Sequence, residues 1–522
     1  MVQRAYLPIS RRTFVRTAVV GGAAVSALGT FGCQSVSERV DTLILGSGFG
    51  GSIVAYRLAL AGHRTVVLER GKRWTVNTPG EDVFSSMAPG RVDRRASWLD
   101  GRIPLPGYPP ARPTARYTGI LERIHGNGID VVCAAGVGGG SLVYSGMMVR
   151  PERQFSDETF PQVSYDTMTP YYERVREMMR PQRLPDDLLA RPEWTATRTF
   201  LEQAERAGYR SERLLCAFDF DKARLEADGG IPPQLLTGSY IYGLNSGAKA
   251  TLDQSYLGMA EMSGLCEVRP LHWAQTITQQ SDGYTVVYHR IDEDGVVLEE
   301  RQITARRLFV SCGTVNTNGI LRRSKIEGKL PNLPDEVGEG FGNNGLHIKA
   351  RDNIGVNTGT TQAGPACAML YDHENRLSME NGPAPIGGQL LISTGIGIPT
   401  GRGVIGWDAA TGKVSVEWNN ANDRQAQEAT TNVIAQLNRA NGGVETTFFD
   451  LNDPITFHPL GGCIHDQATD LFGRLRNHPG LYVVDGSLIP GVTPCANPFW
   501  TVSANAERCI ETIAREDYAG MV

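Results

Sequence analysis

The sequence predicts an α/β protein of two or more domains, with a parallel sheet that begins near its N-terminus. The chain has 522 residues, which is too many for one small hydrophobic core. Residues 42–45 form a short apolar run typical of a buried strand, and a glycine-rich turn and the helix-forming run 52–60 follow it. Residues 65–68 then read as a second strand. This order of strand, turn, helix and strand is the start of a parallel nucleotide-binding sheet.

The glycine-rich turn matches the pattern G-x-G-x-x-G. Gly46 permits the tight turn, Gly48 lets the backbone approach a pyrophosphate, and Gly51 lets the helix pack closely on the strand. The N-terminus of the helix then faces the phosphate charge. Glu69 ends the second strand about 20 residues further on, where an acid can accept a hydrogen bond from a ribose hydroxyl. Such a pattern also occurs by chance in loops, but here every element of its context stands in order.

Composition and charge exclude several classes of protein. Hydrophobic residues make up 41% and charged residues 20% of the chain, as in soluble globular proteins. The net charge of -5, with no basic run beyond the N-terminal segment, argues against a nucleic-acid partner. The nine cysteines form no C-x-x-C pair and no cluster with histidines. We therefore predict no metal site and mostly buried free thiols, although export would permit a disulfide.

Residues 1–38 are predicted to be a targeting segment. Residues 10–16 form a twin-arginine pattern, and the apolar run 17–31 is too short and too rich in glycine and alanine for a membrane span. Twin-arginine export carries folded proteins, which suits a protein that binds its cofactor inside the cell, and predicts a secreted or cell-surface location. The alternative is a chance arginine pair before a disordered tail. Cys33 could carry a lipid anchor, but Thr30 and Phe31 fit that cleavage pattern poorly.

The middle of the chain carries a second glycine cluster and a long loop. Residues 74–128 are rich in proline, glycine and arginine, and 105–113 cannot form a helix or an inner strand, so we expect a lid, a binding segment or disorder. Residues 135–147 contain four glycines in five positions, which would let a backbone lie against a flat ligand. A flexible linker is the alternative, but the apolar residues that follow should be buried. Helices are expected near 170–180, 196–208 and 425–441, and a β-meander over 268–287 that continues into 303–311.

The last segment of the chain holds most of the chemistry-bearing residues. His458 stands before Pro459 and a glycine pair, at a stiff turn. Residues 481–487 read as a strand that ends in Asp-Gly, and Asn497 precedes a proline that opens a helix. His458 and Asn497 also have purely structural interpretations. His458 is then an ordinary core or surface imidazole, and Asn497 is a helix cap. Glu380, in a run bounded by proline and glycine, reads on the residues alone as a solvated carboxylate.

With these motifs together, the chain resembles the glucose–methanol–choline (GMC) family of flavin oxidoreductases, and within it the bacterial cholesterol oxidases that hold flavin non-covalently. The resemblance runs from Asp41 to Glu516. Its anchors, in chain order, are residues 46–51, 136–143, 458–463, 482–490 and 497–499. Their joint occurrence in this order is far more specific than any one of them.

The resemblance implies FAD as the cofactor and an α/β fold with two domains. The FAD-binding, Rossmann-like domain would be assembled from discontinuous segments, and the substrate domain would be α+β, with helices and a mainly antiparallel β-sheet. The FAD-binding segments would be 39–75, 248–340 and 475–519. The substrate-binding segments would be 76–247 and 341–474.

The resemblance also implies individual site residues. Glu69 would bind the adenosine ribose, Ala274 would meet adenine through its backbone, and Phe499 would lie near the flavin ring. His458 and Asn497 match the catalytic pair of the family, and Glu380 matches its acid because 380–385 has the form Glu-x-x-Pro-x-Pro. The full set implied to bind the cofactor is Gly46, Ser47, Gly48, Phe49, Gly50, Gly51, Glu69, Gly138, Gly139, Ser141, Met147, Ala274, Asp485, Gly486, Asn497, Pro498 and Phe499.

The implied reaction is oxidation of the 3β-hydroxyl of a sterol to the 3-ketone, with dioxygen giving hydrogen peroxide. His458 would accept the hydroxyl proton or orient the hydroxyl, and Asn497 would position it or contact the flavin edge. Glu380, with its pKa raised by an apolar site, would move a proton to convert the 5-ene ketone to the 4-ene. Because sterols reside in bilayers, transient membrane-surface contact is expected, although the sequence shows no amphipathic anchor.

Departures from the cholesterol oxidase pattern keep two alternatives open. Tyr144 and Ser145 stand where those enzymes usually carry Asn and Gly, and Leu346 stands at an Asn position although Asn344 is kept. The first alternative is a GMC dehydrogenase that acts on another alcohol and passes electrons to a quinone or carrier protein. The second is a secreted flavin-binding protein without turnover, such as a sterol carrier; loss of the His458 and Asn497 pair would favour it, and both residues are present.

Overall fold

The computed structural model describes residues 38–100, 115–446 and 454–519. The predicted targeting segment, apart from Glu38, lies outside the described residues, as does Cys33. The proline-rich run 105–113 also lies outside them. Within the described parts of the chain, none of the helices combines the length and the apolar character that crossing a membrane would require.

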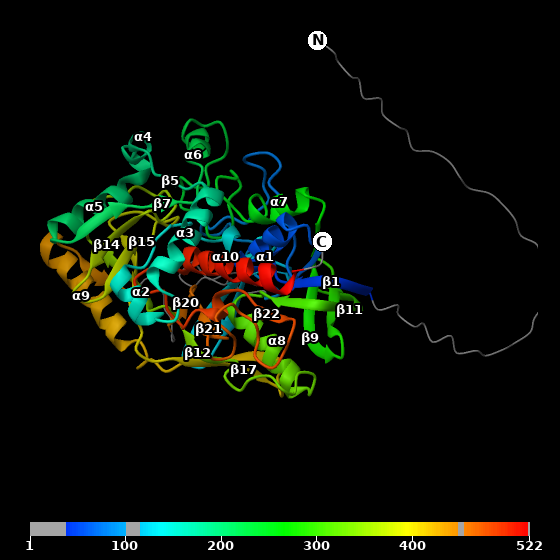
Figure 1. Ribbon diagram of the computed structural model, residues 1–522. Coiled ribbons are helices and arrows are strands. Elements are labelled where there is room, and N and C mark those ends of the chain that lie inside the picture. The colour runs from blue at the N-terminus through cyan, green and yellow to red at the C-terminus, as the bar shows by residue number, and fades with distance from the viewer. Residues whose placement is uncertain (1–37, 101–114, 447–453, 520–522) are drawn as a thin grey trace, which may run out of the picture. The chain divides into compact units, whose positions relative to one another are not determined.

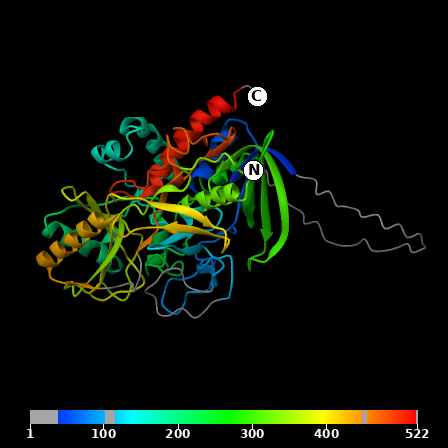
Figure 2. The same cartoon turned by 90° about the horizontal axis from the view of Figure 1, so that it is seen from below.

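A seven-stranded sheet forms one end of the molecule (Figures 1 and 2). Its parallel part places β1 between β2 and β11, because residues 43–45 are fully buried and need neighbours on both sides. The strands β11, β10 and β9 then continue the sheet as an antiparallel meander, as predicted. The strands in spatial order are β8 (Cys266–Pro270), β2 (Thr65–Glu69), β1 (Glu38–Leu45), β11 (Val297–Val310), β10 (Gly283–Ile291) and β9 (His272–Gln280), with β22 (Leu481–Val483) parallel to β11.

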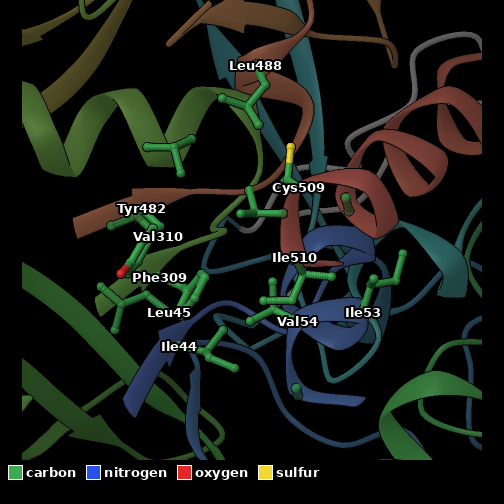
Figure 3. Packing of buried hydrophobic residues seen from close by; sticks show 14 of the residues in the cluster. Ile44, Leu45, Ile53, Val54, Phe309, Val310, Tyr482, Leu488, Cys509 and Ile510 are labelled. Atoms are coloured by element: carbon green, nitrogen blue, oxygen red, sulfur yellow. The ribbon is translucent and has the colours of Figure 1, made fainter. Parts of the chain in front are cut away.

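The core of this part packs α1 (Phe49–Leu60) and α10 (Pro498–Asp517) together beside the sheet (Figure 1). Figure 3 shows Ile53 and Val54 of α1 close to Ile510 of α10, with Ile44 of β1 and Phe309 of β11 in the same cluster. Helix α7 (Tyr256–Met262) packs on α1, α3 (Tyr165–Met179) packs on α10, and α8 (Thr314–Ile326) packs on β9. The helix α1 beside this sheet is therefore covered by a helix from the C-terminal end of the chain.

A six-stranded antiparallel sheet forms the other large layer, with α5 (Thr195–Arg206) and α9 (Arg424–Asn441) against it. Helix α9 approaches β16 closely because that strand carries a glycine: a Cβ on Gly395 would lie 2.3 Å from Oγ1 of Thr430. The strands in spatial order are β19 (Val444–Thr446), β13 (Leu346–Asp352), β16 (Leu391–Ile396), β15 (Leu377–Asn381), β14 (Ala368–Asp372) and β6 (Arg210–Arg213).

Three smaller sheets and the short helices complete the described fold. The first sheet has the order β18 (Lys413–Glu417), β17 (Gly403–Asp408), β12 (Glu339–Gly342) and β21 (Leu460–Gly462). The others are β20 (Ile455–Thr456), β4 (Asp130–Ala134) and β3 (Leu121–His125), and the pair β5 (Gln182–Arg183) and β7 (Leu215–Cys216). The remaining helices are α2 (Arg153–Thr159), α4 (Asp186–Leu189), α6 (Phe220–Ala227), and the 3₁₀ turns η1 (Arg94–Ala96), η2 (Gly139–Leu142), η3 (Pro192–Trp194) and η4 (Gly486–Leu488).

The predicted fold class is confirmed: the protein is of mixed α/β type with several sheets. The strands of the seven-stranded sheet come from three separated stretches of sequence, 38–69, 266–310 and 481–483. The six-stranded sheet uses residues between 210 and 446. The domain boundaries drawn from the sequence stay a prediction. The stretch 74–128 is irregular over most of its described part, as predicted, but it also contains the strand β3, which was not predicted.

Candidate active site

A cavity of about 1080 Å³ is lined by residues of both large sheets and by most of the predicted site residues. The first glycine turn, Glu69 and Ala274 line it, and we call this part the nucleotide end after the cofactor predicted there. Glu380 of β15 also lines it, and we call that part the substrate end after the role predicted for this acid. His458 and Asn497 also stand on the cavity wall. The structure therefore brings together segments that lie hundreds of residues apart in the sequence.

The first glycine turn has the geometry that a dinucleotide cradle needs. Gly46 has φ of +89°, and a Cβ there would lie 2.4 Å from the carbonyl oxygen of Ser311. A Cβ on Gly51 would lie 2.1 Å from the carbonyl oxygen of Gly46, so this glycine permits close packing of helix on strand. Gly48 differs: a Cβ there would meet no atom within 4 Å, and the residue faces the cavity. Gly48 is thus the position that leaves room for a ligand.

Glu69 is held at the nucleotide end with one side of its carboxylate still available. Its Oε2 accepts from the backbone N–H of Ser47 at 3.0 Å and from Oγ of Ser47 at 2.7 Å. Its Oε1 accepts from the N–H of Gly71 at 2.8 Å. A carboxylate offers about four acceptor positions, so these three bonds leave one for a ligand hydroxyl. The ribose contact of Glu69 stays a prediction with which this geometry agrees.

The second glycine cluster forms η2 and touches the first turn. A Cβ on Gly139, whose φ is +52°, would lie 2.7 Å from Cα of Gly48. The N–H of Gly138 donates to Oγ of Ser47 at 3.2 Å. We refer to the two touching segments, residues 46–51 and 138–144, as the cradle. Both glycine clusters of the sequence therefore build one wall.

Three of the predicted cofactor residues stand behind the cavity wall. Gly51, Gly138 and Ser141 do not line it, whereas the other fourteen predicted positions do. Ser141 donates from Oγ to the carbonyl oxygen of Gly138 at 2.7 Å and accepts from the N–H of Leu252 at 2.9 Å. These three residues shape the cradle rather than form its surface.

Asp485 lines the cavity but its carboxylate is engaged with the protein. Oδ2 accepts from the N–H of Gly313 at 3.0 Å and from Oγ1 of Thr317 at 2.6 Å, and Oδ1 accepts from the N–H of Ser487 at 2.8 Å. Asp485 therefore joins the end of β22 to the first turn of α8. Burial raises the pKa of this carboxyl, and the hydrogen bonds oppose that rise. A cofactor contact at Asp485 would therefore be made by its backbone or by the remaining lone pair of its carboxylate.

Glu380 and Asn497 form a buried hydrogen-bonded pair on the wall of the cavity. Nδ2 of Asn497, at the N-cap of α10, donates to Oε2 of Glu380 at 3.0 Å. Glu380 is only 9% exposed, and burial raises its pKa to about 7 although the Asn497 hydrogen bond lowers it. Oδ1 of Asn497 is buried without a hydrogen-bond partner among the described residues. A buried acceptor of this kind is costly unless a ligand pairs with it.

His458 is held as a neutral imidazole with a defined tautomer. Oδ1 of Asn344 accepts from the N–H of Thr493 at 2.7 Å, which fixes the orientation of the amide, so Nδ2 must face Nδ1 of His458 at 3.3 Å. An amide nitrogen only donates, so Nδ1 is the acceptor and the proton sits on Nε2. Burial lowers the pKa of His458 to about 3, which keeps the ring neutral at pH 7. The N–H of His458 also donates to Oγ1 of Thr456 at 3.0 Å.

Asn344, which the resemblance gives only as an asparagine shared with the cholesterol oxidases, is a further site residue. Its φ of +61° and its hydrogen bonds to His458, Thr493 and Ala496 place it behind the imidazole. Gly313 and Thr314, at the start of α8, also line the cavity and were not predicted. A strand ending in Ser-Cys-Gly before a helix was the sequence signal for them. Over residues 38–100, 115–446 and 454–519, no set of three His, Cys, Asp or Glu side chains could hold a metal ion.

The cavity fits a flavin dinucleotide on three observations. The cradle has open space at Gly48, Glu69 keeps a free acceptor position, and Oδ1 of Asn497 lacks a partner among the described residues. Three aromatic rings also form a continuous wall, since Phe499 lies 5.6 Å from Phe49 and 5.0 Å from Tyr144 between ring centroids. Such a wall can pack against a planar ring.

Comparison with known proteins agrees with this geometry. Two models of the GMC oxidoreductase family match the chain, over residues 19–357 and 409–506. A cholesterol oxidase of Mycobacterium tuberculosis is 26% identical over 90% of this chain and 90% of its own length. A cholesterol oxidase of Acinetobacter baumannii is 23% identical, over 91% and 94%.

Solved structures support the same fold. A pyridoxine 4-oxidase from Mesorbium loti superposes with a TM-score of 0.62 at 15% identity, covering 91% of this chain and 99% of that one. A fungal aryl-alcohol oxidase superposes with a TM-score of 0.61 at 12% identity, covering 92% and 99%. Members of the matched family are oxidoreductases that act on alcohols and generally bind FAD. The chain therefore belongs to the GMC oxidoreductase family and is similar over most of its length to bacterial cholesterol oxidases.

Proposed function

We propose that this protein binds FAD and oxidises the 3β-hydroxyl of a sterol to the 3-ketone, with dioxygen as acceptor and hydrogen peroxide as product. We further propose that it converts the 5-ene ketone to the 4-ene. The observation that carries the proposal is the placement of His458 and the Glu380–Asn497 pair on the wall of one cavity. The relatives named cholesterol oxidase support the sterol, at low identity.

The cradle, Glu69, Gly486 and the start of α10 would hold the cofactor. When bound, FAD supplies a ring that accepts a hydride from the carbon that bears the hydroxyl. The chain's own residues then have to bind the alcohol, orient it, exclude water and remove protons. The orphan Oδ1 of Asn497 is available to accept a hydrogen bond from whatever group lies against it.

The substrate end of the cavity supports an apolar alcohol. Apart from the catalytic polar groups, its wall is built mainly from aliphatic and aromatic side chains. Burial of a sterol ring system against them would be favourable at about 25 cal/mol per Å² of apolar surface. The apolar lining residues are Met87, Val143, Met147, Ile241, Leu346, Ile348, Pro383, Ala384, Ile392 and Phe457.

His458 would orient the hydroxyl by donating a hydrogen bond from Nε2. Of the two roles considered from the sequence, the tautomer favours this one, because Nδ1 is occupied by Asn344 and Nε2 already carries a proton. The imidazole then cannot accept the hydroxyl proton at Nε2. Glu380 is the base on the same cavity, and with a pKa of about 7 its carboxylate is partly ionised at neutral pH.

Glu380 would also carry out the isomerisation. Its Oε2 is held by Asn497, so Oε1 is the oxygen free to take a proton from the carbon between the ketone and the double bond. Return of that proton to the far end of the double bond gives the conjugated ketone. No electron is gained or lost in this step, and the carboxylate is regenerated.

The test uses the full chain purified with its bound flavin. Cholesterol and a panel of simple alcohols are supplied with dioxygen as the sole acceptor, and hydrogen peroxide is measured together with the ketone products. The proposal expects peroxide with cholesterol and loss of that activity in His458→Ala with flavin still bound. Unchanged turnover in His458→Ala would remove the imidazole from the reaction.

One part of the dehydrogenase alternative, an alcohol other than a sterol, has its own support, because the matched solved structures are named for other alcohols. Both are named oxidases, so they do not support a different electron acceptor. It expects reduction of a quinone and little peroxide, and it expects turnover with a smaller alcohol. A flavoprotein that binds sterol without any product would instead indicate a binding protein. The same assay therefore separates the three functions.

A further inference from the structure

One lysine links the cradle to the wall of the substrate end. Lys249 is 3% exposed. Its Nζ donates to the carbonyl oxygen of Leu142 at 2.9 Å and to the carbonyl oxygen of Tyr240 at 2.5 Å. Leu142 is the last residue of η2 in the cradle, and Tyr240 lines the cavity. Lys249 itself does not line the cavity, so it acts through these two neighbours.

The hydrogen bonds of Lys249 suit a neutral amine. A buried ammonium without a counter-charge is strongly disfavoured, and no carboxylate in the described part of the chain pairs with this one. Burial lowers the pKa of Lys249 well below its ordinary value. A neutral amine has two N–H groups, and the two carbonyl oxygens satisfy both. Truncation of the side chain would leave both carbonyls without this partner.

The segment that carries Lys249 runs beside the cradle. Oη of Tyr144 donates to the carbonyl oxygen of Ala250 at 2.6 Å, and the N–H of Leu252 donates to Oγ of Ser141 at 2.9 Å. These two bonds join the segment to the cradle alone. Lys249 is the residue of this segment whose side chain also reaches the substrate wall.

We infer that Lys249 is a positioning residue that couples the cofactor cradle to the substrate wall. The carbonyl oxygens of Leu142 in η2 and of Tyr240 share one donor, Nζ of Lys249. A shift of one carbonyl therefore disturbs the hydrogen bond to the other, so the geometry of either end of the cavity constrains the other. The Tyr240 ring itself has little freedom, because it packs where a Cβ on Gly364 would lie 2.5 Å from its Cδ1. The inference rests on the proposed function in that the cradle is taken to bind FAD.

The experiment measures two constants on the same variants. Lys249→Met keeps the unbranched chain as far as the ε position and removes both donors. We expect its FAD dissociation constant, followed by flavin fluorescence, to rise about tenfold, the effect of one unpaired buried polar group. We expect the KM for cholesterol to rise as well, while kcat of the FAD-saturated variant changes less. Lys249→Gln, whose amide has two N–H groups, should restore part of both effects.

Lys222→Met is the matched control. Nζ of Lys222 donates to the carbonyl oxygen of Gly247 at 2.8 Å, close to the same segment, but no hydrogen bond joins it to the cradle or to Tyr240 among the described residues. Both constants should stay at wild-type values in this control.

Two outcomes overturn the coupling: a Lys249→Met variant with both constants within twofold of wild type, or a change in only one of them. If Lys249→Met does not fold, Lys249→Gln decides by the same two constants. A wild-type protein that binds no FAD overturns the proposed function and this inference with it. Wild-type FAD binding with an insensitive Lys249→Met overturns the inference alone.

Discussion

The hydrogen bond between Glu380 and Asn497 connects an acid with a raised pKa to the start of a helix. Asn497 stands at the N-cap position of α10, but its side chain makes no capping hydrogen bond to that helix. Its amide is thereby free to hold one oxygen of Glu380 and to present Oδ1 to the cavity. Asn497 therefore both holds Glu380 in place and offers a hydrogen-bond acceptor to a ligand in the cavity.

Replacement of Glu380 by Gln should slow the oxidation and abolish the isomerisation. The amide keeps the shape of the side chain but can take neither the hydroxyl proton nor the proton on carbon, so the ketone that still forms should remain the 5-ene. In the wild type, formation of the 4-ene should rise as the pH passes upward through about 7, because the carboxylate forms in that range. Product analysis by chromatography across a pH series on both sides of this value measures both. A native yield of 4-ene from the variant would place the base elsewhere.

The same substitution should change the pH dependence of stability. The pKa of Glu380 is raised from 4.5 to about 7 in the folded protein, so between these values the unfolded chain releases a proton that the folded chain retains. Wild-type stability therefore falls as pH rises through this window. Above it, near pH 8, Glu380→Gln should be the more stable protein by up to about 3 kcal/mol, and near pH 4.5 the difference should vanish. Denaturant unfolding at the two pH values checks the sign, and a constant difference would contradict it.

At the scale of elements, two glycines have different roles where α1 meets the ends of β1 and β22. Gly48 begins α1 at an ordinary φ of −73° and faces open space. A Cβ on Gly50 would lie 1.6 Å from the carbonyl oxygen of Val484 at the end of β22. The first position is kept small for a ligand, and the second for the packing of the fold.

Two alanine substitutions should therefore give different results. Gly48→Ala should fold with near-wild-type stability and lose FAD affinity, because its methyl group projects toward the cavity. Gly50→Ala should lose about 3 kcal/mol or more of stability, because helix and strand must separate. Thermal melting of the apoprotein with a parallel FAD titration measures both. Equal stability losses in the two variants would show that Gly48 is also a packing position.

The sequence could predict elements whose signals are local. The strand–turn–helix unit, the β-meander, α9 and α10 follow from apolar periodicity, glycine turns and a proline at the first helical position. It could also place Glu380, His458 and Asn497 near one another, through the resemblance of their motifs. It could not predict that Asn344 sets the tautomer of His458, or that the carboxylate of Asp485 binds the start of α8. Those contacts depend on backbone groups that only the folded arrangement brings together.

At the scale of the whole molecule, the N-terminal segment and the cavity together bear on where in or outside the cell the protein acts. We propose export of the folded protein by the twin-arginine route and transient contact with a membrane surface, from which a sterol could be drawn. Replacement of Arg11 and Arg12 together by Lys should retain the protein inside the cell with its flavin bound. Cell fractionation with a flavin absorbance measurement checks this. Unchanged export would leave the arginine pair without a targeting role.

The C-terminal origin of β22, which extends the seven-stranded sheet, and of α10, which covers α1, has a consequence for biosynthesis. β1 and α1 leave the ribosome early, but β22, which pairs with β11, and α10, which packs on α1, emerge only after most of the chain has been translated. A nascent or truncated polypeptide therefore lacks β22 and α10, which belong to the proposed cofactor site, so FAD would bind only after release from the ribosome. Bound flavin, visible as a yellow colour in the purified protein, would then indicate a full-length chain.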